Sequence, residues 1–433
     1  MTVAKECAET YVTTLQDRCP PMTGESTRIG YILQLYPSLT MTFIYREVLA
    51  LEKAGFSIAA FSVWKPARDR LSEEARSLMD STYYIFPVSW LKFISAHLYF
   101  LFTHPAKYIG TALFVMTRQG ESWKNRRRTA YHFGEAAYVA KEIQRLRIQH
   151  LHAHFEHNAA SIALIVSRLL GISFSFTAHN ILFTDQILLK EKIREARFVV
   201  AISQFTRQYL IRLMPGEKYD DKIQIVHCGV CPADFAPPEP RPVNVVPVLL
   251  FVAQLAERKG APILVEACQL LVEQGVAFQC VIAGDGPQKE TVKRLVEQHH
   301  LQEFVSLPGA IFQEQLKQYL GQTDIFVLPC ITTDDGDMDG VPVVLMEALA
   351  SEIATVSTNV SGIPELIQDG ESGLLVQQKD AVALADALRH LIDDKELRVR
   401  LGKNGRRKVL LEFDIDQNAA QLAALIEGHI GSA

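Results

Sequence analysis

The chain of 433 residues lacks any long uninterrupted hydrophobic run. Its most apolar stretch, residues 83–116, is broken by lysines, histidines and a proline, whereas a membrane-spanning helix needs about 20 consecutive apolar residues. Residues 1–27 contain charges and no apolar run, so they do not have the pattern of a secretory signal. The sequence therefore predicts a chain that does not cross a membrane and that begins with a disordered or loosely ordered extension over residues 1–27.

Paired cysteines and an excess of positive charge are also missing. The seven cysteines are an odd number and are scattered along the chain, and Cys280 stands in an apolar run, where a reduced thiol packs as a small hydrophobe. This usage predicts a reducing, cytoplasmic compartment. With 44 basic and 49 acidic residues the net charge is −5, which gives no general attraction to nucleic acid. The sequence accordingly predicts no nucleic-acid partner.

What the chain does contain is a regular alternation of short strand-like runs with longer helical patterns. Such alternation is typical of parallel sheets with crossover helices. Among the helices, the patterns predict one over residues 42–54 and one over 159–170. The predicted strands cover residues 28–34, 57–63, 82–86, 150–154, 173–177, 198–202 and 223–226, and then 248–253, 279–283, 305–307, 325–328, 355–358 and 373–376.

A proline-rich stretch separates the two series of strands, because prolines there exclude regular structure. The sequence predicts an N-terminal domain over 28–235, a linker over 236–247 and a C-terminal domain over 248–412. Residues 413–433 are predicted to contain a helix that packs on either domain, including the arrangement in which it crosses back to the first. The expected fold class is α/β, with two doubly wound Rossmann-like domains facing each other across a cleft. Ligands of such sheets bind beyond the carboxyl ends of the strands.

The segment from Asp339 to Glu347 carries the strongest chemical signal. Pro342 suits the first turn of a new helix, and Gly340 lets the preceding loop approach a ligand closely. The helix then offers backbone N–H groups and a positive dipole end to a diphosphate, while the two carboxylates can accept hydrogen bonds from separate hydroxyl groups of one ligand. The alternative is a set of acids that only stabilise a helix N-terminus.

A calcium loop beginning at Asp335 is rejected. Such a loop needs a glutamate at its twelfth position, which Met346 occupies here, and its flanks should be helical. The sequence predicts no bound calcium.

Two further turns follow strands of the second domain. Lys259, five residues after Gln254, can meet a phosphate as a point charge, although a solvated basic turn is an alternative. Gly284 and Gly286 form a glycine-rich turn that permits close approach of the backbone, which is a weak signal by itself.

Histidines gather at strand ends of the first domain. His179 ends one predicted strand, and alternation places His150, His152 and His154 on one face of another. Histidines in this arrangement could bind zinc, but no cysteine pair lies nearby, so the pattern favours no metal. A lone histidine is more often a core residue than a catalyst, and His179 therefore needs support from elsewhere.

From about residue 28 to residue 427 the chain resembles bacterial glycosyltransferase family 4, with the closest likeness to capsular, colanic-acid and exopolysaccharide enzymes. The resemblance implies a GT-B fold, with the acceptor on the first domain and a nucleotide sugar on the second. It also implies a retaining reaction with no required metal and no cofactor, the nucleotide sugar being a substrate. The matching motifs lie at residues 36–44, 152–155, 176–179, 226–230, 283–287, 340–348 and 356–367.

The resemblance assigns the roles of the family's functional residues to the residues of this chain at matching positions. The resemblance implies that Glu347 binds the donor ribose and Asp339 the transferred sugar, that Lys259 faces the diphosphate, and that His179 touches the sugar near the reacting carbon. His179, Asp339 and Lys259 are thus the expected catalytic residues. Donor binding is expected to involve Lys259 together with Glu347, Gln254, Gly284, Gly286, Gly340, Val341, Pro342, Val343, Val344, Thr40 and Thr42.

Three positions depart from the family pattern. Asp339 replaces the usual first glutamate and shortens its reach by one methylene. Gln254 stands where many members have an arginine that assists the lysine, and Met41 stands where the subgroup usually has glutamate. These changes leave the expected fold unchanged and bear on the identity of the donor and on the catalytic strength.

The expected chemistry is transfer of a sugar from UDP, GDP or a similar carrier to a saccharide or lipid-linked saccharide, in polysaccharide or glycoconjugate biosynthesis. Negative charge on the leaving diphosphate is stabilised electrostatically, and no carboxylate pair of the retaining-glycosidase type is evident. Two alternatives stay open: a nucleotide-sugar epimerase of similar architecture, and a degenerate, non-catalytic partner in a polysaccharide assembly complex.

An aromatic-rich stretch over residues 90–102, followed by Lys124 and three arginines at 126–128, resembles an interfacial surface for anionic lipid. It predicts peripheral contact with the inner face of the cytoplasmic membrane. A buried helix pair followed by a solvated basic turn is the equally weighted alternative.

Overall fold

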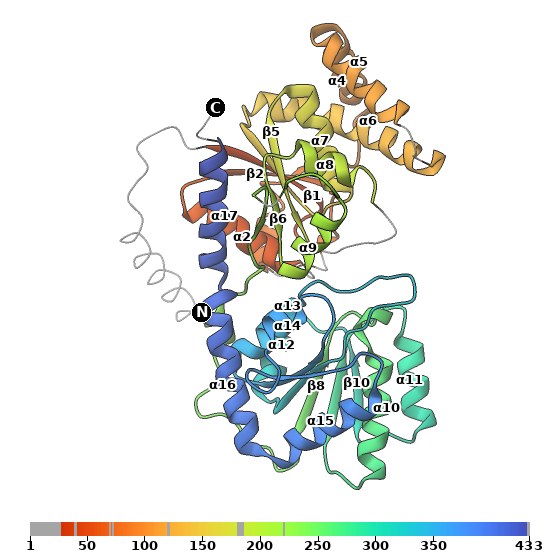
Figure 1. Ribbon diagram of the computed structural model, residues 1–433, viewed down its shortest axis with the longest axis vertical. Coiled ribbons are helices and arrows are strands. Elements are labelled where there is room, and N and C mark those ends of the chain that lie inside the picture. Colours follow the sequence, from red (N-terminus) through yellow and green to blue (C-terminus); the bar gives the residue numbers. More distant parts are fainter. Residues whose placement is uncertain are drawn as a thin grey trace.

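The computed structural model describes residues 27–38, 41–68, 71, 73–118, 122–179, 186–219 and 221–430. Within these residues the chain forms two lobes, each built around one sheet whose paired strands all run parallel (Figure 1). This confirms the predicted pair of doubly wound, Rossmann-like units.

The first sheet has seven strands in the order β3-β2-β1-β4-β5-β6-β7. Because β1 lies between β2 and β4, the strand order reverses beside it, which is where ligands of open α/β sheets bind. The strands are β1 (Arg28–Leu35), β2 (Ser57–Trp64), β3 (Tyr83–Tyr84), β4 (His150–His154), β5 (Ser173–Ala178), β6 (Val199–Ala201) and β7 (Ile223–Ile225).

The second sheet has six strands in the order β10-β9-β8-β11-β12-β13. Its switch point lies between β8 and β11. The strands are β8 (Val248–Val252), β9 (Gln279–Ala283), β10 (Val305–Gly309), β11 (Ile325–Leu328), β12 (Ala354–Thr358) and β13 (Leu374–Val376).

Helices cover the sheets, and their apolar faces close the cores. In the first lobe they are α2 (Thr42–Lys53), α3 (Glu73–Ser77), α4 (Trp90–Thr103), α5 (Pro105–Thr117), α6 (Trp123–Arg145), α7 (Asn158–Leu170), α8 (Leu189–Glu195) and α9 (Gln204–Arg212). The rest are η2 (Pro232–Phe235), η3 (Glu257–Lys259), α10 (Ala261–Glu273), α11 (Lys289–Gln298), α12 (Gln313–Gly321), α13 (Val343–Ala350), α14 (Ile363–Leu366), α15 (Ala381–Asp393), α16 (Lys395–Glu412) and α17 (Ile415–Ile430).

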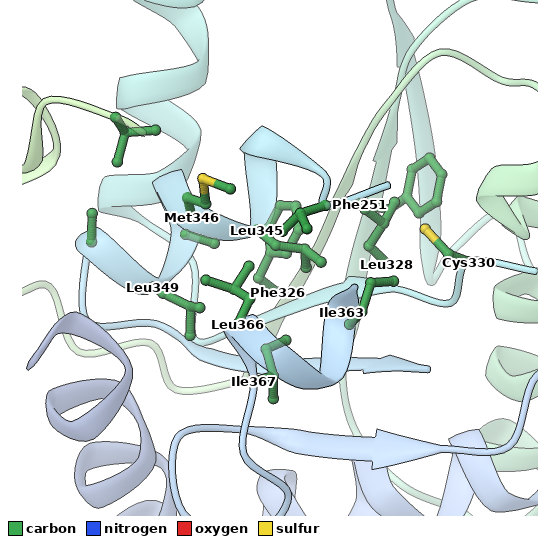
Figure 2. Packing of buried hydrophobic residues seen from close by; sticks show 14 of the residues in the cluster. Phe251, Phe326, Leu328, Cys330, Leu345, Met346, Leu349, Ile363, Leu366 and Ile367 are labelled. Carbon is green, nitrogen blue, oxygen red and sulfur yellow. The ribbon is translucent and has the colours of Figure 1, made fainter. Parts of the chain in front are cut away.

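The core of the second lobe fixes α13 in place. Leu345, Met346 and Leu349 are fully buried and pack with side chains from β11 and α14, among them Phe326 and Leu366 (Figure 2). Burial of each such side chain contributes roughly 1.5–3 kcal/mol. The N-terminus of α13 is therefore held firmly at the edge of the sheet.

The last helix joins the two lobes. In Figure 1 α16 runs along the second lobe and α17 continues along the first, where α17 packs against α2. Between them, the Val230 N–H donates to the carbonyl of Phe413 at 3.0 Å, and the Ile415 N–H donates to the carbonyl of Val230 at 2.9 Å. The C-terminal segment thus ties the second lobe to the first.

The helices α4 and α5 project from the first lobe (Figure 1), where both pack against α6 and α5 also packs against α7. Only Ala96 and Phe100 of α4, and Thr111 and Val115 of α5, are buried. The alternative of a buried helix pair is therefore wrong, and the basic residues 124–128 lie in the first turns of α6 rather than in a turn. Among the described residues, no helix combines the length and hydrophobicity needed to span a bilayer.

A carboxylate from the second lobe caps a helix of the first. Glu365 of α14 accepts the backbone N–H groups of Gln204 and Phe205, the first residues of α9, at 2.7 and 2.9 Å. Loss of such a cap costs about 1 kcal/mol. We expect Glu365→Ala to lower the melting temperature by about 2–4 °C, measured by calorimetry. Glu303→Ala, at an exposed glutamate of the same lobe, is the matched control, and equal melting of the two variants would contradict the role of this contact.

Candidate active site

The two lobes meet at Gly340. A Cβ atom added there would lie 2.4 Å from the carbonyl oxygen of His179, which follows β5 in the other lobe. Any side chain would push the loops apart, so only glycine allows this approach. The structure thereby brings the loop that carries Asp339 directly against the strand end that carries His179.

Asp339 is buried and is held by two cations. Lys259 Nζ lies 2.7 Å from Asp339 Oδ2, and Arg258 Nε lies 3.3 Å from Oδ1. Arg258 also pairs with Asp337 at 3.0 Å. Burial would raise the pKa of Asp339, but attraction and hydrogen bonding to Lys259, and then to Arg258, outweigh it and hold the pKa below its ordinary value. Asp339 is therefore a carboxylate near neutral pH.

Arg258 was missed from the sequence. Its position directly before Lys259 was the available signal, but a basic turn of this kind is usually solvated. The structure instead places its guanidinium half-buried against two aspartates, in the short helix η3 that follows β8.

The backbone around Pro342 begins α13. Pro342 has extended dihedral angles and caps the helix, whose first helical residue is Val343 and whose last is Ala350. The first backbone N–H groups of a helix have no intrahelical acceptor and carry partial positive charge. Val341 is buried, whereas Val343 and Val344 are half-buried. The free N–H groups at the start of α13 therefore follow Asp339 within a few residues, as the sequence motif predicts.

Glu347 lies one turn into α13 and is buried. Burial raises its pKa to about 7, an effect lessened by Arg46 and Lys317 and reinforced by Asp234. Arg46 belongs to α2 of the first lobe, lies 3.6 Å from Asp234, and has a buried Nη1 without a partner among the described residues. The surroundings of Glu347 are therefore built by both lobes.

The glycine-rich turn packs against the loop that contains Gln254. A Cβ at Gly284 would lie 2.0 Å from the carbonyl oxygen of Ala253, and one at Gly286 would lie 2.7 Å from that of Leu255. These glycines let two loops touch at the carboxyl edge of the sheet. The side chain of Gln254 is exposed there.

Of the two threonines expected near the phosphates, Thr42 is the first residue of α2 and is buried. Thr40 lies outside the described residues.

The histidines of β4 form a hydrogen-bonded ladder with hydroxyl groups of β5. His150 contacts Ser173 and Ser175 at 2.8 and 2.7 Å, and His152 contacts Ser175 and Thr177 at 2.8 and 2.9 Å. Burial lowers the pKa values of both histidines, so both are neutral near pH 7.

The third histidine of β4 links His179 to a half-buried acid, Glu47. His154 Nε2 lies 3.0 Å from Glu47 Oε1, and His154 Nδ1 lies 2.8 Å from His179 Nε2. Tyr31 donates its hydroxyl to the same oxygen of Glu47 at 2.7 Å. A continuous hydrogen-bonded chain therefore runs from Glu47 through His154 to Nε2 of His179.

The other nitrogen of His179 is also engaged, because Nδ1 lies 3.4 Å from Cys228 Sγ. Burial, and then the charges of His154 and His157, lower the pKa of His179, and burial raises that of the Cys228 thiol. A neutral ring thus accepts from a protonated thiol. The His179 ring faces its own lobe, and the group that meets the second lobe is its backbone carbonyl.

Glu47, His152 and His154 have ligand atoms within 4.8 Å of one another and are the one metal-like group in the described part of the chain. Both ring nitrogens of each histidine already have hydrogen-bond partners. The arrangement is explained as a hydrogen-bonded network rather than as a ligand set.

Two family models match the chain. Residues 102–234 match Glycosyltransferase Family 4 and residues 237–408 match Glycosyl transferases group 1. The two matches fall on the two lobes, and the boundary between them falls at the end of η2, before β8.

Relatives of known name match about half of the chain. A putative colanic acid biosynthesis glycosyltransferase WcaL of Escherichia coli is 41% identical over 212 residues, which are 48% of this chain and 51% of that protein. A GDP-mannose-dependent alpha-(1-6)-phosphatidylinositol monomannoside mannosyltransferase of Mycobacterium tuberculosis is 30% identical over 183 residues, 42% of this chain and 48% of that protein. The chain thus spans about half the length of these relatives.

The fold extends the likeness over nearly the whole chain. The crystal structure of Anabaena Alr3699/HepE in complex with UDP-glucose aligns with a TM-score of 0.70 at 16% identity, covering 93% of this chain and 99% of that one. At this identity the match shows a shared fold, the GT-B arrangement of two Rossmann-like domains. The two lobes are thus matched in order by the two models, and the chain contains a Glycosyltransferase Family 4 domain followed by a Glycosyl transferases group 1 domain.

Proposed function

We propose that the chain transfers a sugar from a nucleotide-sugar donor, bound at the second lobe, to a saccharide or lipid-linked saccharide acceptor held by the first. The observation that carries this proposal is the cluster of Lys259, Arg258 and Asp339 beside the N-terminus of α13, pressed against His179 by the Gly340 contact. It combines cations for a diphosphate with a carboxylate for sugar hydroxyls. The colanic acid relative supports a role in exopolysaccharide biosynthesis.

The leaving diphosphate is the centre of the proposed mechanism. As the bond from the anomeric carbon to the diphosphate oxygen breaks, negative charge grows on that oxygen. Lys259 and the N–H groups of Val343 and Val344 stabilise this charge, a role that requires no metal. Arg258 adds a guanidinium to the same loop and so offsets the arginine that is missing at position 254.

The proposed outcome is retention of the anomeric configuration. The acceptor oxygen attacks the anomeric carbon from the face that the diphosphate leaves, and its proton passes to a phosphate oxygen of the leaving group. Asp339 orients the transferred sugar, and the Glu47–His154–His179 chain fixes the neighbouring strand end. An inverted product anomer, observed by NMR, would contradict this step.

The helices α4 and α5 support a peripheral membrane contact. Their outward side chains are large and apolar, with Trp90, Leu91 and Phe102 exposed by 71, 84 and 77%. Lys124 and Arg127 in the first turns of α6 are exposed beside them. Exposed apolar helices flanked by cations match the chemistry of an anionic lipid surface, and we propose that this hairpin rests on one.

The donor site is tested by calorimetric titration with UDP, GDP and ADP. We expect one of them to bind and to raise the melting temperature by mass action. Lys259→Ala should weaken that binding about tenfold or more, because a charged hydrogen bond contributes about 1.5–3 kcal/mol. Lys293→Ala, at an exposed lysine of α11, should bind as the parent does. A folded protein that binds none of the three would overturn the proposed donor site.

Glu347 makes the binding depend on pH. If its carboxylate accepts ribose hydroxyls, binding must release the proton that it holds below about pH 7. The affinity for the selected nucleotide should then be about tenfold lower at pH 6 than at pH 8. Glu347→Gln should keep only the pH dependence of the nucleotide's own phosphate. Parallel profiles for the two proteins would exclude Glu347 as the titrating group.

The proton on Glu347 also affects the stability of the unliganded protein, with a pH dependence opposite to that of nucleotide binding. Because the folded-state pKa of about 7 lies above the reference value of 4.5, the contribution of this proton to the free energy of unfolding is complete below pH 4.5. It is lost as the pH rises to 7. The loss is on the order of 3 kcal/mol, and Glu347→Gln should remove it in denaturant titrations.

The membrane contact is tested by sedimentation with vesicles. We expect binding to phosphatidylglycerol vesicles at low salt and release at high salt, because the lysine and arginine contribution is screened. The double variant Leu91→Asp, Phe102→Asp should lose the binding. Val382→Asp, at a side chain 61% exposed on the second lobe, should not. Unchanged binding of the double variant would exclude the hairpin as the contact.

A further inference from the structure

A cavity of about 640 Å³ lies at the edge of the first sheet where its strands end. β1 supplies Gln34, β2 supplies Trp64, and the first residue of α7 supplies Asn158. His154 and His179 stand at the carboxyl ends of β4 and β5. In a parallel sheet these ends share one edge, so the cavity is on the side of the lobe that carries His179.

Aromatic rings form one wall of the cavity. Trp64 and Tyr131 line it, and Phe86 lies between them, with ring centroids 4.5 Å from Trp64 and 6.2 Å from Tyr131, at interplanar angles of 18° and 5°. Trp123 lines the cavity from the start of α6 and is 69% exposed. Exposed flat rings of this kind are suited to stacking on the apolar face of a sugar ring.

Cations and hydrogen-bonding groups complete the lining. Lys124 and Arg127 are exposed in the first turns of α6, where the positive end of a 23-residue helix adds to their charge. The side-chain oxygen of Gln34 is buried without a partner among the described residues. Glu135 is the acidic residue that lines the cavity. It is buried, and its Oε2 lies 2.7 Å from Nδ1 of His132. The accessible charge of the cavity is therefore positive.

We propose that this cavity binds the acceptor as a phosphate-bearing saccharide, with the sugar on the aromatic wall and the phosphate at Lys124 and Arg127. The inference rests on the proposed glycosyltransferase function and names the acceptor class for it. A neutral sugar would have no charge to pair with the two cations, and inorganic phosphate would have no apolar face to stack on the aromatic rings.

The surroundings favour a phosphate that is esterified to a lipid. A second cavity of about 550 Å³ shares Trp64 with the first and is otherwise lined by Lys65, Phe86, Pro87, Val88 and Trp90. Trp90 is the first residue of α4, whose exposed face is the proposed membrane contact. An alkyl chain leaving the phosphate thus has an apolar path from the cavity to the hairpin.

The chain's own fluorescence reports on this site, because its three tryptophans are Trp64, Trp90 and Trp123, and all line the two cavities. Glucose 1-phosphate, its decyl phosphodiester, glucose and inorganic phosphate are titrated separately while the emission is followed. We expect glucose 1-phosphate to bind at least tenfold more tightly than glucose or phosphate, and the decyl ester to bind more tightly still.

Variants test which residue contacts the phosphate and which contacts the sugar. Arg127→Ala should weaken glucose 1-phosphate about tenfold and leave the affinity for glucose unchanged, whereas Trp123→Leu should weaken both. Lys293→Ala is the control. Equal affinity for all four ligands, or no effect of Arg127→Ala, would overturn the proposal.

The outcome is separable from that of the donor experiment. Nucleotide binding without sugar-phosphate binding would leave the donor site standing and remove this one. Sugar-phosphate binding in a protein that binds no nucleotide would support the cavity and remove the proposed transfer reaction.

Discussion

The buried carboxylate of Asp339 is the constraint on which the site depends. A charge taken out of water is costly unless cations and hydrogen bonds meet it, and here Lys259 and Arg258 do so. Their short helix η3 must then stay against the loop after β11. Gly260 allows this, since a Cβ there would lie 1.9 Å from the carbonyl oxygen of Pro329. The ion pair and the glycine contact together fix the geometry of the second lobe at the cleft.

That geometry has a chemical consequence. In the proposed function, a diphosphate at Lys259 would compete with Asp339 for the same ammonium group, and donor binding would then be coupled to the charge environment of Asp339. The pKa of Glu347, about 7, depends on burial and on Arg46, a residue of the first lobe. The electrostatics of the proposed donor site thus depend on both lobes.

The first lobe is organised around hydrogen bonds rather than ion pairs. The ladder of histidines and hydroxyl groups between β4 and β5 satisfies polar groups inside the sheet, and its last member connects Glu47 to His179. The ring of His179 faces inward and its carbonyl faces Gly340. The apolar face of α4 and α5 is instead turned outward, so the contact with the second lobe and the apolar hairpin are formed by different parts of this lobe.

Local sequence patterns were sufficient for the sheets. Strand ranges, the α/β class and the helix that begins near Pro342 follow from periodicity, turn residues and the rigidity of proline, which act within a few residues. The family motifs likewise singled out Asp339, Glu347, Lys259 and His179, whose expected roles stay predictions. These features were predictable because each depends on neighbouring residues in the sequence.

Contacts between distant segments were decided only by tertiary structure. The partnership of Arg258 with Asp339, the chain from Glu47 through His154 to His179, and the unburied state of α4 and α5 depend on which surfaces meet after folding. Their residues are separated by up to 107 positions in the case of Glu47 and His154, and identical local patterns are compatible with solvated turns and buried helices. Pairing, burial and the pKa values that follow from them are properties of the folded chain.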